Sequence, residues 1–370
     1  MIGLAPICGF AFSLLTGAFL IFAKPMHTSH TLDRAVGIQK IHTQPTLRVG
    51  GIALMIGAIA GGFYLDRAAF GIWTTVCLCS LPAFMSGLAE DLSKRVGAKW
   101  RLIATLFAGQ AVVQSTGFRI DRIGIPGADF LLSFQAFAVF FTAFAIAGVA
   151  NAINIIDGIN GLATGVAIIN LIALASLAQV VGDQLMLQLC LLTIAVLAGF
   201  FILNFPFGRI FLGDAGAYSA GFVVATLAVA VPYRNPVLSP LVGLLVVAYP
   251  VVETVVTIQR RLGRNRGPVG QPDRLHLHSL IFRRNARSMT RTSGFPFSRH
   301  ILTCAVVLTL PILSAWLALL TYDEPPKILV GFAAVGVLYI FLYRRVALLP
   351  LVPGISSQSK RVPGRPGGVR

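Results

Sequence analysis

Long apolar segments occupy most of this sequence of 370 residues, and their length restricts the folds that it can adopt. A helix needs about 20 mainly apolar residues to cross the hydrocarbon core of a bilayer. Eleven segments come close to this length, at about 2–23, 49–66, 69–88, 100–117, 131–149, 160–180, 186–203, 215–232, 237–257, 300–320 and 328–348. Charged residues make up only 12% of the chain, whereas a soluble domain contains about 25%. The sequence therefore predicts an all-α polytopic membrane protein with about eleven transmembrane helices.

Lysine and arginine are distributed unevenly between the loops. Eleven spans place the two termini on opposite faces and divide the loops into two sets. One set contains 25 of the 30 Lys and Arg, in loops 24–48, 89–101, 150–159, 204–214 and 258–299 and in the tail after 343. The other set contains only Arg67, Arg119, Arg122, Arg234 and Lys327. Because cytoplasmic loops carry the excess of positive charge, we expect the first set in the cytoplasm, the N-terminus outside and the C-terminus inside.

The net charge of +17 follows mainly from this topology, so it does not require a nucleic-acid partner. The basic run 260–266 is also suited to anionic lipid head groups or phosphates. All five cysteines fall inside apolar segments, so the sequence predicts neither a disulfide framework nor a thiolate metal site. The first apolar segment lacks a charged n-region and a small-residue cleavage site before Lys24, so we expect a retained helix there.

Polar residues interrupt the apolar pattern most sharply at 151–165, which contains Asn151, Asn154, Asp157 and Asn160. Polar groups in or beside a membrane span are costly, and they indicate a functional site by default. The glycines of Asp-Gly-x-Asn-Gly also indicate a turn with accessible backbone N–H groups. This stretch alone fits a transporter as well as an enzyme.

Two earlier loops contain residues suited to a phosphate or a metal ion. Lys40, His42 and Arg48 precede a Gly-Gly pair at a helix start, where cations and free N–H groups bind phosphate. An ordinary basic loop with a helix-start proline is the alternative. Glu90 and Asp91 lie at a helix end and can bind a hard divalent cation or accept a proton. Their alternative is a solvated acidic pair beside neighbouring lysine and arginine.

Two later loops add a carboxylate, an aromatic ring and histidines. Asp214 lies in Gly-Asp-x-Gly at a helix start, where it is either an N-cap or, with Asn204 and Phe211, part of a site for a metal, a phosphate and a flat ring. His276 and His278 follow Arg274, which fits diphosphate binding, with plain polar surface as the alternative. A structural zinc site is not expected, because no cysteine or third histidine is near.

Together these loops resemble the polyprenyl-phosphate N-acetylhexosamine-1-phosphate transferases of glycosyltransferase family 4. That family includes UDP-GlcNAc:undecaprenyl-phosphate GlcNAc-1-phosphate transferases and phospho-MurNAc-pentapeptide translocase. The motifs that carry the resemblance occur in the family's order, at 40–51, 90–94, 151–162, 204–216 and 273–278. Each motif is weak alone, whereas five in order on one predicted face are specific.

The resemblance implies roles for individual residues. Asp214 and Asp91 are the implied ligands of Mg²⁺, with Mn²⁺ as an alternative ion. Glu90, Asp91, Asp214 and His276 are the implied catalytic residues, of which the acidic pair deprotonates the lipid phosphate or assists at the metal. The implied substrate-binding residues are Lys40, His42, Arg48, Lys94, Asn154, Asp157, Asn160, Asn204, Phe211, Arg274 and His278. Phe211 corresponds to the ring that stacks on uracil, and Asn160 to the residue that reads the uracil edge.

Two positions depart from the family pattern, since Glu90 and Asn160 each replace an aspartate. An amide offers a donor and an acceptor, so Asn160 can still pair with a nucleobase edge. The loop before the histidines lacks the insertion associated with the translocase. This favours the GlcNAc-type branch, with UDP-MurNAc-pentapeptide as the alternative substrate.

The resemblance implies an enzyme that transfers an N-acetylated amino-sugar 1-phosphate from a UDP-sugar to undecaprenyl phosphate, releasing UMP. It implies a multi-pass protein of the bacterial inner membrane that initiates a cell-envelope polysaccharide of the O-antigen kind, and it leaves a homodimer open. We expect residues 1–349 to form one transmembrane catalytic domain, whose active site is built from the cytoplasmic loops, and residues 350–370 to form a disordered basic tail. A secondary transporter and a non-catalytic lipid-binding relative are the rival interpretations.

Overall fold

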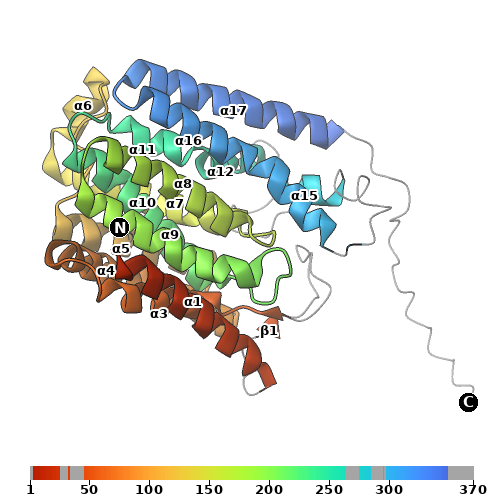
Figure 1. The fold of residues 1–370 in the computed structure, drawn as a ribbon. Helices are drawn as coiled ribbons and strands as arrows, with labels where there is room; N and C mark the ends of the chain where they lie inside the picture. The colour runs from red at the N-terminus through yellow and green to blue at the C-terminus, as the bar shows by residue number, and fades with distance from the viewer. Residues whose placement is uncertain are drawn as a thin grey trace, which may run out of the picture.

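The computed structural model describes residues 3–25, 46–262, 275–284, 295 and 297–348, and the backbone of 32–33. Its helices lie side by side in one bundle, with α1 (Leu4–Phe22) and α17 (Pro325–Leu348) on opposite edges (Figure 1). Within these residues, eight helical segments are long and apolar enough to cross a membrane. The prediction of an all-α polytopic membrane protein is therefore confirmed.

Every predicted apolar segment coincides with helix. The remaining helices are α3 (Gly50–Gly62), α4 (Arg67–Ser93), α5 (Ala98–Thr116), α6 (Pro126–Leu132), α7 (Gln135–Ile156), α8 (Leu162–Val180), α9 (Gln184–Asn204), α10 (Gly213–Arg234), α11 (Leu241–Val246), α12 (Ala248–Leu262), α13 (Leu277–Arg283), α15 (Ser298–Val307) and α16 (Thr309–Thr321). Two predicted segments are divided, because the helix is interrupted at Val247 between α11 and α12 and at Leu308 between α15 and α16. The count of eleven spans stays a prediction, since α3, α5 and the α11–α12 pair lie outside the eight.

Helix α10 forms the centre of the bundle and packs against α3, α4, α7 and α8. In its most apolar window, 94% of the residues are buried, compared with 22% for α1 and α17. Small residues explain this packing, because they let helix backbones approach closely. A side chain at Gly221 would place its Cβ 2.8 Å from Cα of Ala150 in α7, and one at Gly87 of α4 would meet N of Ala215 at 2.5 Å.

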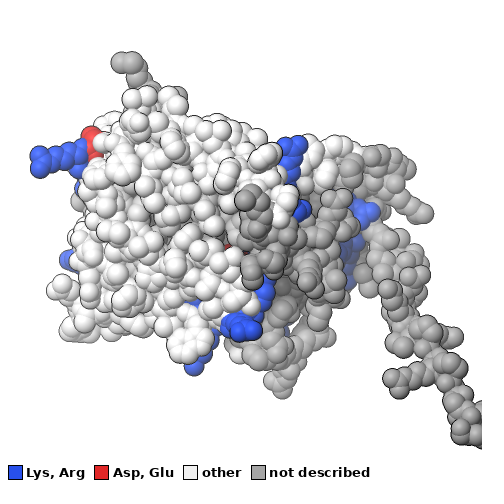
Figure 2. All heavy atoms as spheres, turned by 90° about the horizontal axis from the view of Figure 1, so that it is seen from below, with Lys and Arg blue, Asp and Glu red and all other residues white. Residues whose placement is uncertain are grey.

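The two predicted sets of loops lie at opposite ends of the bundle. At one end, Asp183 accepts a hydrogen bond from Nε of Arg234 at 2.8 Å, and N of Ser239 donates to O of Tyr322. At the other end, the segment before α3, the end of α4 and the loops after α7 and α9 meet around the first turn of α10, as described below. Figure 2 shows an uncharged band between charged residues toward the two ends. Which end faces the cytoplasm remains a prediction.

Short extended segments bring the N-terminal motif to α10. Strand β1 (Leu32–Asp33) pairs antiparallel with β2 (Thr46–Leu47). Leu47 also forms a parallel bridge with Ile210, and N of Phe211 donates to O of Leu47 at 2.7 Å. These bonds fix the backbone around Arg48 beside the loop that leads into α10. All five cysteines are free thiols.

Candidate active site

The first turn of α10 is held by a carboxylate from another helix. Asp91, near the end of α4, accepts hydrogen bonds from N of Asp214 at Oδ1 and from N of Ala215 at Oδ2, both at 2.9 Å. The first N–H groups of a helix have no partner within the helix, and a carboxylate also complements the positive end of the helix dipole. Asp91 therefore acts as an N-cap supplied by α4, and both of its oxygens are occupied.

Glycines make this close approach sterically possible. Gly213 has a φ of 74°, in the left-handed region that glycine adopts without strain. A Cβ on Gly213 would lie 2.6 Å from Oδ2 of Asp91, and a Cβ on Gly51 of α3 would lie 2.5 Å from N of Gly216. The glycines of the Gly-Asp-x-Gly and Gly-Gly motifs are thus required by packing at the start of α10.

The side chain of Asp214 is surrounded by positive and amide groups. Its Oδ1 accepts from Nη2 of Arg48 at 2.6 Å and from Nδ2 of Asn154 at 3.0 Å. Its Oδ2 is paired with Nη1 of Arg101, from α5. Nε of Arg48 also lies 3.0 Å from Oδ1 of Asp91. Two guanidinium groups therefore face two carboxylates in a cluster formed by five residues of four helices and one loop.

Further aromatic and amide groups border this cluster. The guanidinium of Arg101 lies 5.8 Å from the ring centroid of Tyr218 in α10. The hydroxyl of Tyr218 donates to Oδ1 of Asn151 at 3.2 Å, and Asn151 lies one turn before Asn154 on α7. The Asn-x-x-Asn spacing places both amides on one face of the helix. One amide therefore orients Asp214, while the other orients the ring beside Arg101.

A second set of contacts joins the turn after α7 to the loop after α9. Asn204 is buried, accepts from N of Gly161 at 2.6 Å and donates to O of Ile210 at 2.8 Å. Nδ2 of Asn160 donates to O of Pro206 at 3.0 Å. Both amides therefore connect the two loops, and this fixes the turn that contains Asp157.

The two histidines lie in α13 and at its N-cap, against the same turn. Their rings stack with centroids 5.5 Å apart. Nδ1 of His276 lies 3.1 Å from Oε1 of Glu253, a buried carboxylate of α12. A Cβ on Gly158 would lie 2.5 Å from Nε2 of His278, so the imidazole sits directly on the Asp157–Gly158 turn. Burial lowers the pKa of His278 to about 3, which keeps its imidazole neutral near pH 7.

The carboxyl of Asp157 has a raised pKa. It lies just beyond the last residue of α7, where burial of the carboxyl raises its pKa to about 7, against an opposing effect of Arg48. Asp157 is therefore poised to exchange a proton near neutral pH. The side chain of Glu90 bonds to the backbone that follows its own helix, because its Oε2 accepts a hydrogen bond from N of Val96 at 2.8 Å.

Sequence comparison identifies proteins that this chain resembles. Residues 73–232 match the family model described as glycosyl transferase family 4. Over 250 residues, the chain is 32% identical to a probable undecaprenyl-phosphate N-acetylglucosaminyl 1-phosphate transferase of Bacillus subtilis, covering 66% of this chain and 67% of that protein. The chain belongs to glycosyl transferase family 4. It is therefore a transferase with membrane-spanning helices.

Two other relatives match a similar share of this family 4 chain. A decaprenyl-phosphate N-acetylglucosaminephosphotransferase of Mycolicibacterium smegmatis is 28% identical over 271 residues, covering 65% of this chain and 66% of the relative. An undecaprenyl-phosphate alpha-N-acetylglucosaminyl 1-phosphate transferase of Escherichia coli K12 is 26% identical over 281 residues, covering 73% and 74%. The matched part of this family 4 transferase is about two thirds to three quarters of either chain.

The structure brings most of the predicted site residues to one end of the family 4 bundle. Arg48, Asp91, Asn154 and Asp214 are in direct contact. The other described residues predicted for the site lie at helix ends or in loops at the same end, namely Glu90, Lys94, Asp157, Asn160, Asn204, Phe211, His276 and His278. Lys40, His42 and Arg274 lie outside the described residues. The roles assigned to all of these residues stay predictions.

Two residues of the site were not predicted from the sequence. Arg101 reaches Asp214 from the first turn of α5, and Glu253 reaches His276 from α12. The signal for Glu253 was present, because a lone carboxylate in an otherwise apolar helix is costly unless it has a partner. Arg101 gave no such signal, since a basic residue at a helix end is common in a cytoplasmic loop.

Proposed function

We propose that this family 4 enzyme transfers an N-acetylated amino-sugar 1-phosphate from a UDP-sugar to undecaprenyl phosphate and releases UMP. The observation that carries the proposal is the buried Asp214, with Arg48 and Arg101 on its carboxylate at one end of an apolar bundle. Such a site lies where a lipid phosphate and a soluble nucleotide can meet. The names of the relatives support both the polyprenyl-phosphate acceptor and the N-acetylglucosamine phosphate group.

The reaction joins two anions, so the site has to offset their repulsion. In the proposed step, an oxygen of the lipid phosphate bonds to the phosphorus attached to the sugar, and the bond from that phosphorus to UMP breaks. Arg48 and Arg101 are suited to bind the phosphate oxygens, because a guanidinium offers a planar pair of donors to such groups. Phosphate monoesters have a second pKa of about 6, so the acceptor is mostly ionised at pH 7 without a strong base.

The donor groups at Asp214 fit a magnesium ion. Mg²⁺ is commonly bound by one or two carboxylates together with substrate phosphates, rather than by a full set of protein ligands. The described residues contain no group of three or more His, Cys, Asp or Glu side chains that could hold a metal alone. Asp214 would hold the ion, beside the amide of Asn154. When bound, Mg²⁺ supplies positive charge to the reacting phosphates.

Asp91 fits an orienting role better than that of a base or a metal ligand. Both oxygens of Asp91 are already engaged by N–H groups of α10, and Oδ1 also faces Arg48. Asp157 of the turn after α7 and His278 of α13, which packs against this turn, form the other wall of the proposed nucleotide-sugar site. We assign the uracil edge to Asn160 and the uracil ring to Phe211, as the family resemblance implies.

We further propose the cytoplasmic face of a bacterial inner membrane as the place of reaction, and an O-antigen-like cell-envelope polysaccharide as the downstream product. UDP-GlcNAc is the favoured donor, because the relatives are named for N-acetylglucosamine. UDP-MurNAc-pentapeptide is the alternative donor. A homodimer is compatible with these proposals but is not needed for the site, which one chain forms.

The test measures UMP release by the purified protein with undecaprenyl phosphate and a panel of UDP-sugars. We expect release with UDP-GlcNAc only when Mg²⁺ or Mn²⁺ is present. Asp214→Asn should abolish release and should also remove bound Mn²⁺ from the electron paramagnetic resonance spectrum. Asp323→Asn, an exposed acid at the other end, is the matched control. Unchanged release by Asp214→Asn at saturating Mg²⁺ would overturn the metal assignment.

The rival functions predict different results in the same preparation. A secondary transporter would move a substrate across sealed vesicles without producing UMP. A non-catalytic lipid-binding relative would bind undecaprenyl phosphate and produce neither flux nor UMP. UMP production that depends on both substrates therefore separates the enzyme from both rivals.

A further inference from the structure

A large apolar crevice lies in the half of the bundle remote from Asp214. It has a volume of about 670 Å³ and is lined by α7, α10, α11 and the segment before α6. This volume is within the range of about 300–1,000 Å³ that is usual for ligand sites. On α10 the lining begins at Ala225, which is 11 residues beyond Asp214, or about 16 Å along a helix. The crevice is therefore separate from the proposed active site.

The walls of the crevice suit a hydrocarbon chain. The partly exposed Phe141, Ala145 and Val149 recur every four residues and so line one face of α7. From Phe141 to Val149 this face is about 12 Å long, close to the depth of one bilayer leaflet, which is about 15 Å. Leu244 and Val247 of the opposite wall are apolar as well. A chain of one leaflet could therefore fill the crevice along its length.

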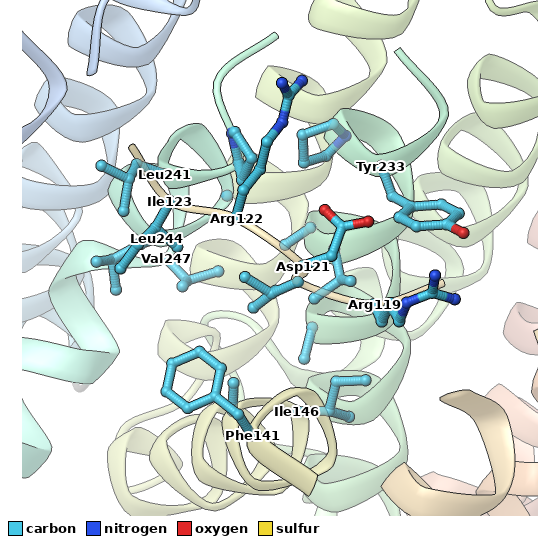
Figure 3. Close-up of a pocket in the computed structure, with 18 of the residues that line it drawn as sticks. Arg119, Asp121, Arg122, Ile123, Phe141, Ile146, Tyr233, Leu241, Leu244 and Val247 are labelled. Atoms are coloured by element: carbon cyan, nitrogen blue, oxygen red, sulfur yellow. The ribbon is translucent and has the colours of Figure 1, made fainter. Parts of the chain in front are cut away.

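Positive charge is concentrated at the mouth of the crevice. Figure 3 shows Arg119, Asp121 and Arg122 on one side of the pocket, with Phe141 and Ile146 on the other. This end of the protein is poor in cations, and yet two of them border one cavity. The three charged side chains at the mouth together contribute one net positive charge.

Arg119 and Arg122 are engaged by an aromatic ring and a backbone carbonyl rather than by a carboxylate. Arg119 lies over the ring of Tyr233, with its guanidinium carbon 5.8 Å from the centroid. Nη2 of Arg122 donates to O of Pro236 at 3.5 Å. Throughout the part of the chain that the structure describes, no salt bridge joins either arginine to an acid. Arg234 and Lys327, at the same end, are by contrast paired with Asp183 and Glu324.

We propose that the crevice binds an anionic phospholipid of the adjacent leaflet, with one acyl chain between α7, α10 and α11 and its phosphate at Arg119 and Arg122. The apolar walls exclude a soluble anion as the main ligand, since its non-phosphate part would be desolvated without compensation. The unpaired arginines favour a lipid with net negative charge over a zwitterionic one. The polyprenyl phosphate acceptor is not the occupant, because its phosphate has to reach Asp214 at the other end.

The test uses the purified full chain in nanodiscs that contain equal amounts of phosphatidylglycerol and phosphatidylcholine with the same acyl chains. Native mass spectrometry after release counts the retained lipids. We expect phosphatidylglycerol to be retained in preference to phosphatidylcholine. The preference should fall about five-fold for each arginine removed in Arg119→Gln and Arg122→Gln, since each basic residue near a lipid surface favours an anionic lipid by about this factor.

Two further variants separate the head group from the acyl chain. Arg67→Gln removes an exposed arginine at the same end but outside the crevice, and should keep the wild-type preference. Ala145→Phe fills the crevice and should reduce phosphatidylglycerol retention although both arginines remain. Thermal melting in detergent confirms that each variant is folded.

Three results would overturn the proposal. Equal retention of the two lipids by the wild type would exclude charge recognition. A wild-type preference in the Arg119→Gln/Arg122→Gln double variant would exclude these arginines. Displacement of phosphatidylglycerol by added undecaprenyl phosphate would assign the crevice to the acceptor.

Discussion

Charged residues are arranged differently at the two ends of the bundle. At the end that contains the candidate active site, Asp91, Asp214, Arg48 and Arg101 form one cluster in which each carboxylate has several partners. At the other end, the salt bridges Arg234–Asp183 and Lys327–Glu324 share no residue, although Asp183 also accepts from Asn235, and Arg122 has no acidic partner among the described residues. Shared partners make a group costly to remove, whereas exposed pairs contribute little. The difference indicates that the salt bridges of the first end depend on one another, whereas those of the second end are independent.

The strongest test of this contrast is Asp91→Ala. The variant removes the acceptor of two N–H groups of α10 and of Nε of Arg48, whose Nη2 keeps its bond to Asp214. Breaking a buried pair in this way costs about 3–5 kcal/mol. We expect a large fall in Tm in detergent, while Asp121→Ala at the other end changes stability by less than about 0.5 kcal/mol. Similar losses at both positions would contradict the contrast.

A second test concerns the close approach of α4 and α10. Gly87→Ala introduces a Cβ that would lie 2.5 Å from N of Ala215, and overpacking of this kind costs about 1–3 kcal/mol. Gly148, in α7, has open space where its Cβ would be, and alanine is favoured over glycine in a helix by about 1 kcal/mol. Thermal melting should therefore show a loss for Gly87→Ala and a gain for Gly148→Ala. A gain for both would show that α4 can move away freely.

A third test uses pH. The pKa of Asp157 is raised to about 7, so the folded protein binds this proton more tightly than the unfolded chain does. Stability should then fall as pH rises from about 4 to 7, by about 1–2 kcal/mol once partial exposure is allowed for. Asp157→Asn removes this dependence. The Tm of the variant minus that of the wild type should increase as the pH rises from 5 to 8. A difference that stays constant over this range would contradict the assignment.

The smallest effect is expected at the end of the bundle remote from Asp214. Glu324→Gln breaks an exposed pair with Lys327, and such pairs contribute about 0.2–1 kcal/mol. The change in Tm should be correspondingly small and should vanish at 1 M salt, where the Debye length is about 3 Å. A large change that persists in salt would show that this end too depends on its charges.

The sequence predicted the elements better than their contacts. Apolar length identified the helices, and the distribution of lysine and arginine separated the loops of the two ends, because both depend on local composition. The break at Val247 was not predicted, although Pro250 has no N–H to bond O of Val246 and so favours a new helix start there. The hydrogen bond between Asn204 and N of Gly161 was not predicted either, because it joins residues 43 positions apart in the sequence.

The same limit applies to the site. Arg48, Asn154 and Asp214 were selected by motif, and they meet. Arg101 completes the cluster through a helix whose sequence gave no indication of a partner. A motif identifies the polar groups that a site needs, whereas the choice of neighbour depends on how α5 and α10 pack.

The arginines on Asp214 have a consequence for ligand binding as a whole. In the proposed reaction, an incoming phosphate would compete with the carboxylate for the same guanidinium groups, so a bound anion would leave Asp214 with negative charge that is no longer balanced. A cation then binds there more tightly, and by thermodynamic reciprocity a bound cation raises the affinity for the anion by the same factor. Positive cooperativity between oppositely charged ligands thus follows from two salt bridges that have to open.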